Sequence, residues 1–387
     1  DRAVRDFEAY LRTVPEVTNF VSYAGSPSPM DFNGMVRHYY WRDAPNLADI
    51  RINLVDKSRR EQQSHAIALR LRKDLEAVAT RHGAKLKIVE TPPGPPVMST
   101  IAVEVYGRPG TAYGELIRAG ERLQGIMRQE PGVVDVDDSA ETDRLMADFI
   151  LDKEKASLHG VDASTVARTL ALALGGSSPA NMHVPYERQP LPIRVRLPRA
   201  VRSSLAQLSG IEVKGRGGKL IPLAEIGDFK RVPVDQPIQH KDLKPVVYVY
   251  AEMAGRPPGE AILDMQDKLA EKPLPPGISA LWDGEGEWEI TLDVFRDLGL
   301  AFLAALAGIY VLLVIETNSF LMPLLIMTAI PLTLLGIMPG FWLLNVFFGG
   351  SVGGFENPIF FTATSMIGMI ALGGIVIRNS LVLIDFI

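Results

Sequence analysis

Arg378 is the residue with the strongest chemical implication. It follows Asn357–Ile377, which has no charged side chain, and the residues after it, Leu381–Ile384, are again apolar. A hydrophobic stretch of about 18 residues or more indicates a membrane helix. Ionisable side chains inside such a helix pair with other charges or line ion and proton paths, so Arg378 is a candidate functional residue. The alternative is that its guanidinium extends to the lipid headgroups at the helix end.

Small residues recur on the same helix at helical spacing. Positions 4, 3, 3 and 4 residues apart lie on one face of a helix with 3.6 residues per turn. Small side chains let neighbouring helices approach closely in lipid. We therefore expect this face to be buried against neighbouring helices, with Asp385 on roughly the same face. The stripe consists of Thr364, Gly368, Ala371 and Gly374, and it leads to Arg378.

Metal chemistry has weaker support in the sequence. The six histidines are scattered, there is no cysteine, and no metalloprotease pattern occurs. Asp135, Asp137 and Asp138 lack the loop and glycine pattern of a calcium site, so they predict a solvated strand end. The sequence predicts no metal site and no cofactor.

Aromatic residues gather in the first 41 positions, where they indicate either an apolar pocket or a hydrophobic core. Met30, Met35 and Met98 offer thioether sulfur, which is a soft metal ligand but more often packs in a core. These alternatives remain open at the level of sequence. The aromatic residues are Phe20, Tyr23, Phe32, Tyr39, Tyr40 and Trp41.

Composition divides the chain into two parts. Of 387 residues, 47% are hydrophobic and 22% are charged, but from Leu298 to Ile387 the only charges are Glu316, Glu356, Arg378 and Asp385. The net charge of −5 and the lack of a basic stripe argue against nucleic acid as a partner. No P-loop or nucleophile elbow is present, so we predict no enzyme.

The apolar part predicts a bundle of three transmembrane helices. About 20 residues span a bilayer core, which fits helices at about 298–315, 320–348 and 358–387. A polar turn at 316–319 and a glycine-rich loop at 349–354 separate them.

The charged part predicts a duplicated α+β unit of the βαβ type, interrupted by an insertion. A helix with Val4, Phe7 and Leu11 on one face precedes a strand at 17–23. A proline-rich linker at 92–96 separates the two copies. Further segments are helices at 64–80 and 116–127, strands at 86–89, 101–105, 133–136, 246–250 and 277–282, and, within the insertion, a helix at 162–174, a strand at 193–197 and a hairpin at 211–223.

The order of these segments resembles the resistance-nodulation-division (RND) exporter permeases. The third helix reads GGIVIRNSLVLID from Gly373 to Asp385, and weaker matches lie at 131–133, 149–152, 220–223 and 329–332. The resemblance covers essentially the whole chain and favours the hydrophobe/amphiphile branch. It implies a fragment from the C-terminal half of a permease: the large periplasmic loop and transmembrane helices eight to ten.

The resemblance assigns a role to each segment. Residues 1–98 would form the first porter subdomain, 99–148 and 244–296 the second with its link to the membrane, 149–243 an inserted docking subdomain, and 297–387 the transmembrane helices. It implies a multi-pass protein of the bacterial inner membrane with a large periplasmic domain. Its expected partners are two further copies in a homotrimer, a periplasmic adaptor, an outer-membrane channel, membrane lipid and a small-molecule substrate.

The resemblance also implies a multidrug efflux pump that exchanges protons for amphiphilic or toxic small molecules. In this branch a Lys-Asn pair occupies the positions of Arg378 and Asn379, and the cation partners acidic residues on a helix outside this chain. Since arginine does not release its proton, Arg378 would act as a fixed counter-charge in proton coupling. Phe20 and Tyr23 are the candidate substrate-cleft residues, although the phenylalanine-lined pocket of drug exporters is otherwise missing.

Two alternatives remain. A heavy-metal cation exporter of the same superfamily predicts clustered methionines in the cleft, for which Met30, Met35 and Met98 are the candidates. A membrane-anchored binding module without transport predicts neither a charged partner for Arg378 nor a trimer.

Overall fold

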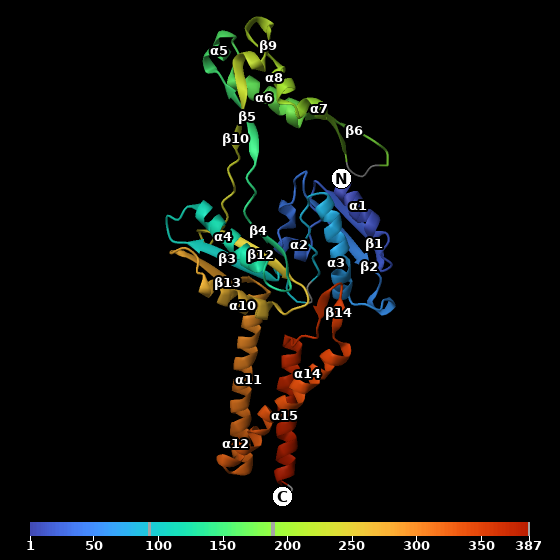
Figure 1. Cartoon of the computed structure of the whole chain (residues 1–387), viewed down its shortest axis with the longest axis vertical. Coiled ribbons are helices and arrows are strands. Elements are labelled where there is room, and N and C mark those ends of the chain that lie inside the picture. Colours follow the sequence, from blue (N-terminus) through green and yellow to red (C-terminus); the bar gives the residue numbers. More distant parts are fainter. Residues whose placement is uncertain (92–93, 187–189, 386–387) are drawn as a thin grey trace. The chain divides into compact units, whose positions relative to one another are not determined.

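The computed structural model describes residues 1–91, 94–186 and 190–385. Pro92 and Pro93 of the expected linker and the last two residues of the expected third helix lie outside this description. The chain forms two compact units, one of residues 1–140 with 238–387 and one of residues 141–237 (Figure 1).

A four-stranded antiparallel sheet in the order β4–β12–β3–β13 organises the first unit, and the short β11 extends it by pairing with β12. This is the strand order of a split βαβ fold. Ile101, Val103 and Val105 alternate onto one face, where helices α4 and α10 cover them. The elements are β3 (Ile101–Gly107), α4 (Tyr113–Met127), β4 (Val133–Asp138), β11 (His240–Lys241), β12 (Lys244–Met253), α10 (Pro258–Glu271) and β13 (Ile278–Gly286).

The N-terminal residues form a smaller lobe in the same unit. Strands β1 and β2 pair in antiparallel fashion, and helices α1 and α3 bury Leu11, Ile67 and Leu71 in a common core. The prediction of a strand at 86–89 is wrong. The backbone amide of Ile88 donates a hydrogen bond to the Asp135 carboxylate and not to a neighbouring strand. The elements are α1 (Arg2–Leu11), β1 (Val17–Ala24), α2 (Phe32–Val36), η1 (Tyr39–Trp41), β2 (Ala48–Leu54), η2 (Lys57–Arg59) and α3 (Ser64–Arg81).

The second unit is inserted between β4 and β12. It is compact over 141–237, earlier at both ends than the expected 149–243, because β5 begins at Leu145 and pairs along its length with β10. Ile221, Leu223 and Ile226 are the centre of its core. Its elements are β5 (Leu145–Leu151), α5 (Lys153–Leu158), α6 (Ala163–Gly175), β6 (Ser177–Met182), β7 (Leu191–Val195), α7 (Arg199–Arg202), α8 (Leu205–Ser209), β8 (Glu212–Lys214), η3 (Arg216–Gly218), β9 (Leu220–Pro222), α9 (Leu223–Ile226) and β10 (Gly227–Pro233).

Asp162 caps helix α6 and predicts an acid-sensitive helix start. Its carboxylate accepts hydrogen bonds from the Ser164 hydroxyl, at 2.6 Å, and from the Thr165 amide, at 2.8 Å, which lower the pKa of Asp162 to about 2. Since the folded pKa lies below the ordinary 3.8, this stabilisation is present above about pH 4 and is lost as the pH falls toward 2. Hydrogen exchange of the α6 amides, corrected for intrinsic rates, should accelerate over that range in the wild type. Asp162→Asn keeps the acceptor oxygen and should show no such transition; identical profiles would contradict the assignment.

Three helical segments of the described residues are long and apolar enough to cross a membrane: Glu287–Thr317, Leu321–Phe348 and Ala363–Leu383. The first starts at Glu287 rather than 298, because the helix begins directly after the glycine that ends β13 and continues through a charged segment. The second is interrupted at Thr328 and Thr333 around Pro331. The first segment is α11 (Glu287–Thr317). The second consists of α12 (Leu321–Met327), α13 (Ala329–Leu332) and α14 (Leu334–Phe348), and the third lies in α15 (Ala363–Asp385).

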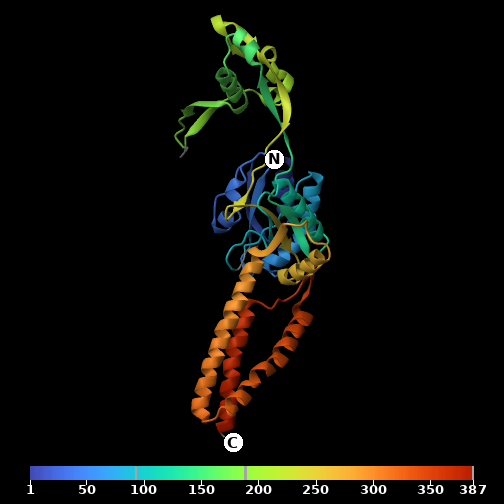
Figure 2. The same cartoon turned by 90° about the vertical axis from the view of Figure 1, so that its left-hand side faces the viewer.

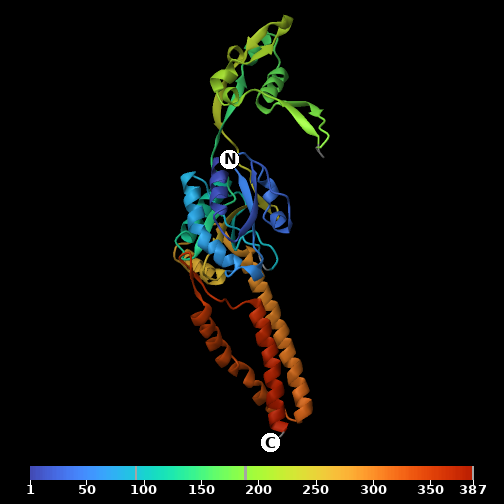
Figure 3. The same cartoon turned by 90° about the vertical axis from the view of Figure 1, so that its right-hand side faces the viewer.

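Helices α11 and α15 lie side by side, while α14 diverges from both (Figures 2 and 3). Leu313, Ile326 and Ile377 form the buried contact of α11, α12 and α15. The expected loop at 349–354 is instead part of a short antiparallel hairpin formed by β14 (Gly350–Val352) and β15 (Phe355–Asn357).

Candidate functional site

Arg378 and Asn379 are exposed on helix α15, and the stripe of small residues is exposed with them. The face that packs within this chain is the neighbouring one, where Ile377 is buried and Gly373 faces Phe302 and Ile330. No helix of the described residues covers the stripe, so its burial against neighbouring helices stays a prediction. A Cβ at Gly368 or Gly374 would meet no atom within 4 Å, so this face has room for another helix.

The acidic partner expected for Arg378 lies outside the contacts of this chain. Among the side chains that the structure describes, no carboxylate forms an ion pair with it. Asp385 lies at the end of α15, and its side chain is not among those described. The role of Arg378 and Asn379 in proton coupling stays a prediction.

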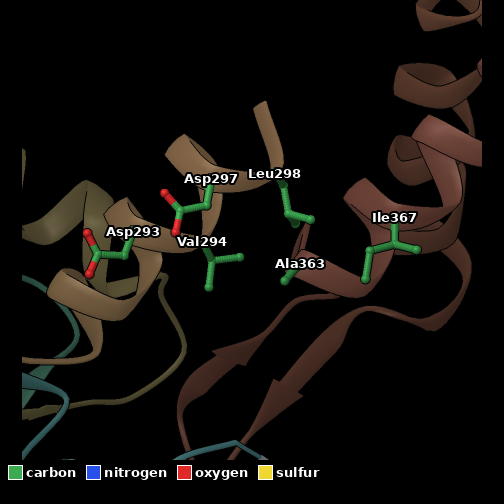
Figure 4. Close-up of a pocket in the computed structure, with 6 residues that line it drawn as sticks. All are labelled: Asp293, Val294, Asp297, Leu298, Ala363 and Ile367. Atoms are coloured by element: carbon green, nitrogen blue, oxygen red, sulfur yellow. The ribbon is translucent and has the colours of Figure 1, made fainter. Parts of the chain in front are cut away.

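A groove of about 470 Å³ lies between the N-terminal parts of α11 and α15. Val294 and Leu298 of α11 point toward Ala363 and Ile367 of α15, while the carboxylates of Asp293 and Asp297 point away from the gap (Figure 4). Arg296 pairs with both carboxylates at 3.0 Å. The groove is thus apolar inside and charged at its edge, which suits an amphiphilic molecule.

A buried charge cluster lies on the sheet face opposite the helices. Glu104 is fully buried, and its Oε1 lies 2.5 Å from Lys241 Nζ, which also pairs with Glu285 at 3.0 Å. The Tyr106 hydroxyl donates to Glu104 Oε2 at 2.6 Å. Burial alone would lower the pKa of Lys241, but the hydrogen bonds that its ammonium donates to Glu104 and Glu285 outweigh burial and raise the pKa above its ordinary value. Lys241 therefore remains charged and ties β11 to β3 and β13.

Two of the three aspartates of β4, Asp135 and Asp137, form ion pairs with cationic side chains. Asp135 is buried and accepts two hydrogen bonds from Arg72, at 2.6 and 3.1 Å. Asp137 pairs with Lys85 and Lys87 of the N-terminal lobe at 3.1 and 2.7 Å. The expected solvated strand end is wrong for Asp135 and Asp137, because cations of the smaller lobe cover them. Nowhere in the described ranges do three His, Cys, Asp or Glu side chains form a group suited to a metal.

The N-terminal candidates do not form one pocket. Phe20 packs in the lobe core under α1 and α3, whereas Tyr23 lies three positions further on and so on the opposite face of strand β1. Met30 and Met35 are exposed in the β1–β2 connection, and Met98 is half-buried before β3. The cleft roles of Phe20 and Tyr23 and the methionine cluster stay predictions.

Sequence reasoning missed the charge clusters, because their members are far apart in the chain. Glu104 and Lys241 are separated by 137 positions. One signal was available: Glu104 is a lone acid within the otherwise apolar alternation of strand β3. A buried acid of this kind requires a cationic partner.

Comparisons with known proteins place this architecture. The model of the AcrB/AcrD/AcrF family matches residues 1–387. The cobalt-zinc-cadmium resistance protein CzcA of Cupriavidus metallidurans is 26% identical over 297 residues, covering 75% of this chain and 26% of that protein. The nickel and cobalt resistance protein CnrA of the same organism is 27% identical over 299 residues, with the same coverage of both chains.

A solved structure supports the fold over nearly the full length. The crystal structure of a heavy metal efflux pump superposes with a TM-score of 0.73 and 19% sequence identity, covering 99% of this chain and 38% of that chain. The chain spans about a quarter of the length of the curated relatives it matches.

Proposed function

Because the chain belongs to the AcrB/AcrD/AcrF family of RND permeases, we propose that the protein is part of an efflux permease that exports metal cations. The observation that carries this proposal is that several relatives, CzcA and CnrA among them, are named for resistance to cobalt, zinc, cadmium or nickel. This reverses the order of the two export hypotheses drawn from the sequence, where the Arg378-Asn379 pair favoured the amphiphile branch.

The proposed transport is driven by protons and occurs in the bacterial inner membrane. Arg378 is a fixed counter-charge whose acidic partners lie on a helix beyond this chain, and their protonation weakens the pair and lets α15 shift. The exposed face of α15 with its small residues supports such a contact. The pump assembles as a homotrimer with an adaptor and an outer-membrane channel, and it performs transport without chemical catalysis.

Export of amphiphiles is the second candidate, favoured by the groove between α11 and α15. Its inner surface is apolar, from Val294, Leu298, Ala363 and Ile367, and carboxylates lie at its edge. An amphiphile would place its apolar part between the helices and its polar part at the edge, where Asp293, Asp297 and Arg296 form ion pairs. A small hydrated metal ion would gain nothing from the apolar lining.

The two candidates predict different resistance profiles. Expression of the complete permease with its adaptor and channel in a sensitive host should raise the tolerated concentration of cobalt, zinc, cadmium or nickel salts. Intracellular metal content, measured by mass spectrometry, should fall in parallel. Expression of the Arg378→Ala permease with the same adaptor and channel is the control, because it shows how much tolerance the host and the partner proteins provide without a functional permease. Raised tolerance to cationic amphiphiles with unchanged metal tolerance would reject metal export in favour of the second candidate.

A groove-filling variant sharpens this distinction. Ala363→Trp inserts a large side chain between α11 and α15 and should reduce only amphiphile export. Leu300→Trp is the matched control, because Leu300 is exposed and does not line the groove. Metal export should be the same in both variants.

A further inference from the structure

The β14–β15 hairpin between α14 and α15 is packed against both lobes of the first unit. It lies between two of the apolar helical segments rather than within them. Figure 1 shows β14 beside the end of α3. Two glycines mark its contacts, one on the hairpin and one on the lobe with the four-stranded sheet.

Gly353 forms the contact with the N-terminal lobe. Its φ is +64°, and a Cβ at this position would overlap the carbonyl oxygen of Leu69 and lie 3.0 Å from the Cα of Arg70. Both are backbone atoms in the first half of α3, held in place by the hydrogen bonds of the helix. The hairpin turn therefore rests directly on the α3 backbone, with no space for a side chain between them.

Gly255 forms the contact with the other lobe. Its φ is +77°, and a Cβ here would lie 2.5 Å from the carbonyl oxygen of Glu356 and 2.9 Å from its amide nitrogen. Gly255 belongs to the turn that joins β12 to α10, and Glu356 is the middle residue of β15. The turn of the hairpin thus contacts the N-terminal lobe, and β15 contacts the lobe with the four-stranded sheet. Both contacts are made by backbone atoms.

The lobes also meet close to the Gly353 contact. Arg72, which pairs with Asp135 of β4, lies on α3 within one turn of Leu69 and Arg70. A displacement of α3 at Leu69 therefore acts on the point where α3 is bound to the four-stranded sheet. Densely packed backbone contacts transmit such a displacement, because protein interiors compress little.

We propose that the β14–β15 hairpin is a strut that converts movement of α15 into a change in the separation of the two lobes. The proposal rests on the proposed function, in which protonation shifts α15 through Arg378. Arg378 lies 15 residues from the start of α15, or roughly 22 Å along the helix at 1.5 Å per residue. The hairpin is the short connection that continues this helix to both lobes.

The test measures lobe separation in the complete permease. This chain has no cysteine, so once any cysteine in the rest of the permease is replaced by serine, a spin-label pair at Glu76→Cys on α3 and Leu263→Cys on α10 reports the distance between lobes. Both positions are exposed. In the wild type, the distance distribution should change on acidification. Gly353→Ala and Gly255→Ala should remove this change and reduce transport by roughly fivefold or more, the scale of common coupling free energies.

Gly354→Ala is the matched control, because Gly354 lies in the same turn with φ +90° but has no atom within 4 Å of its Cβ position. The Gly354→Ala variant therefore has the backbone strain of a positive φ without a clash. The change in lobe distance on acidification should remain in this variant. A second variant distinguishes loss of coupling from misfolding. Three glycines inserted between β15 and α15 keep both glycine contacts but make the connection flexible, and they should also remove the change in lobe distance on acidification.

A wild type without any acid response, or Gly353→Ala and Gly255→Ala variants that keep the full response, would overturn the strut. A normal lobe response in a permease that exports no metal would instead reject the proposed function and leave the strut in place.

Discussion

Replacing Arg378 with alanine in the complete permease is expected to reduce transport by roughly 5- to 150-fold, the range of coupling free energies of about 1–3 kcal/mol. In the proposed mechanism this change removes the fixed positive charge on α15, and protonation of the proposed acidic partners then has no pair to weaken. Transport rate and proton uptake per exported ion are the measurements. Since the side chain is exposed in this chain, its loss should leave the packing of Ile377 against α11 and α12 unchanged.

Arg378→Lys tests the identity of the charge. It should keep much of the transport, because the ammonium preserves the pair, but its pH profile should change, because lysine can titrate and arginine cannot. Leu383→Ala is the control on the same helix, since Leu383 is apolar and exposed. Unchanged rate and proton stoichiometry in Arg378→Ala would support an arginine directed to the lipid headgroups.

Replacing Arg72 with methionine is expected to cost about 3–5 kcal/mol of unfolding free energy, as is typical when one partner of a buried ion pair is removed. Both side chains are nearly fully buried, with 6% of Arg72 and 5% of Asp135 exposed. Without Arg72 the Asp135 carboxylate retains the Ile88 amide as a donor but loses its counter-charge. Because the pair joins α3 to β4, hydrogen exchange should accelerate in both elements.

Two controls separate this effect from the loss of an arginine in general. Arg144→Met removes an exposed pair with Glu141 and should cost about 1 kcal/mol or less. The double variant Arg72→Met with Asp135→Asn also removes the unpaired buried carboxylate, so it should recover a large part of the lost unfolding free energy. Asparagine tolerates the positive φ of 54° at position 135. A cost below about 1 kcal/mol for Arg72→Met would contradict the assignment.

Local patterns predicted the elements that local forces determine. The helix at 64–80 is α3, the helix at 162–174 is α6, and the hairpin at 211–223 contains β8 and β9. The three apolar segments were predicted because their length and lack of charge leave few other structures. The RND family assignment is confirmed, because segment order carries more information than any one motif.

Contacts between distant segments could not be predicted in this way. The strand expected at 86–89 has the right residue types, but Asp135 takes the amide of Ile88 and Lys85 and Lys87 bind Asp137. The spacing of the small residues on α15 predicts one packing face, but spacing alone could not say which helix covers that face. The Arg378-Asn379 pair marked the family, while the preference between metal and amphiphile came only from relatives.

The position of the inserted unit has an evolutionary consequence. Residues 141–237 are inserted between β4 and β12, two strands that are antiparallel neighbours in the sheet. Antiparallel neighbours can be joined by a short turn, so the sheet requires nothing from the insert except two nearby ends. The insert can therefore diverge, lengthen or be exchanged between relatives while the sheet, its helices and the membrane segments keep their own folding requirements.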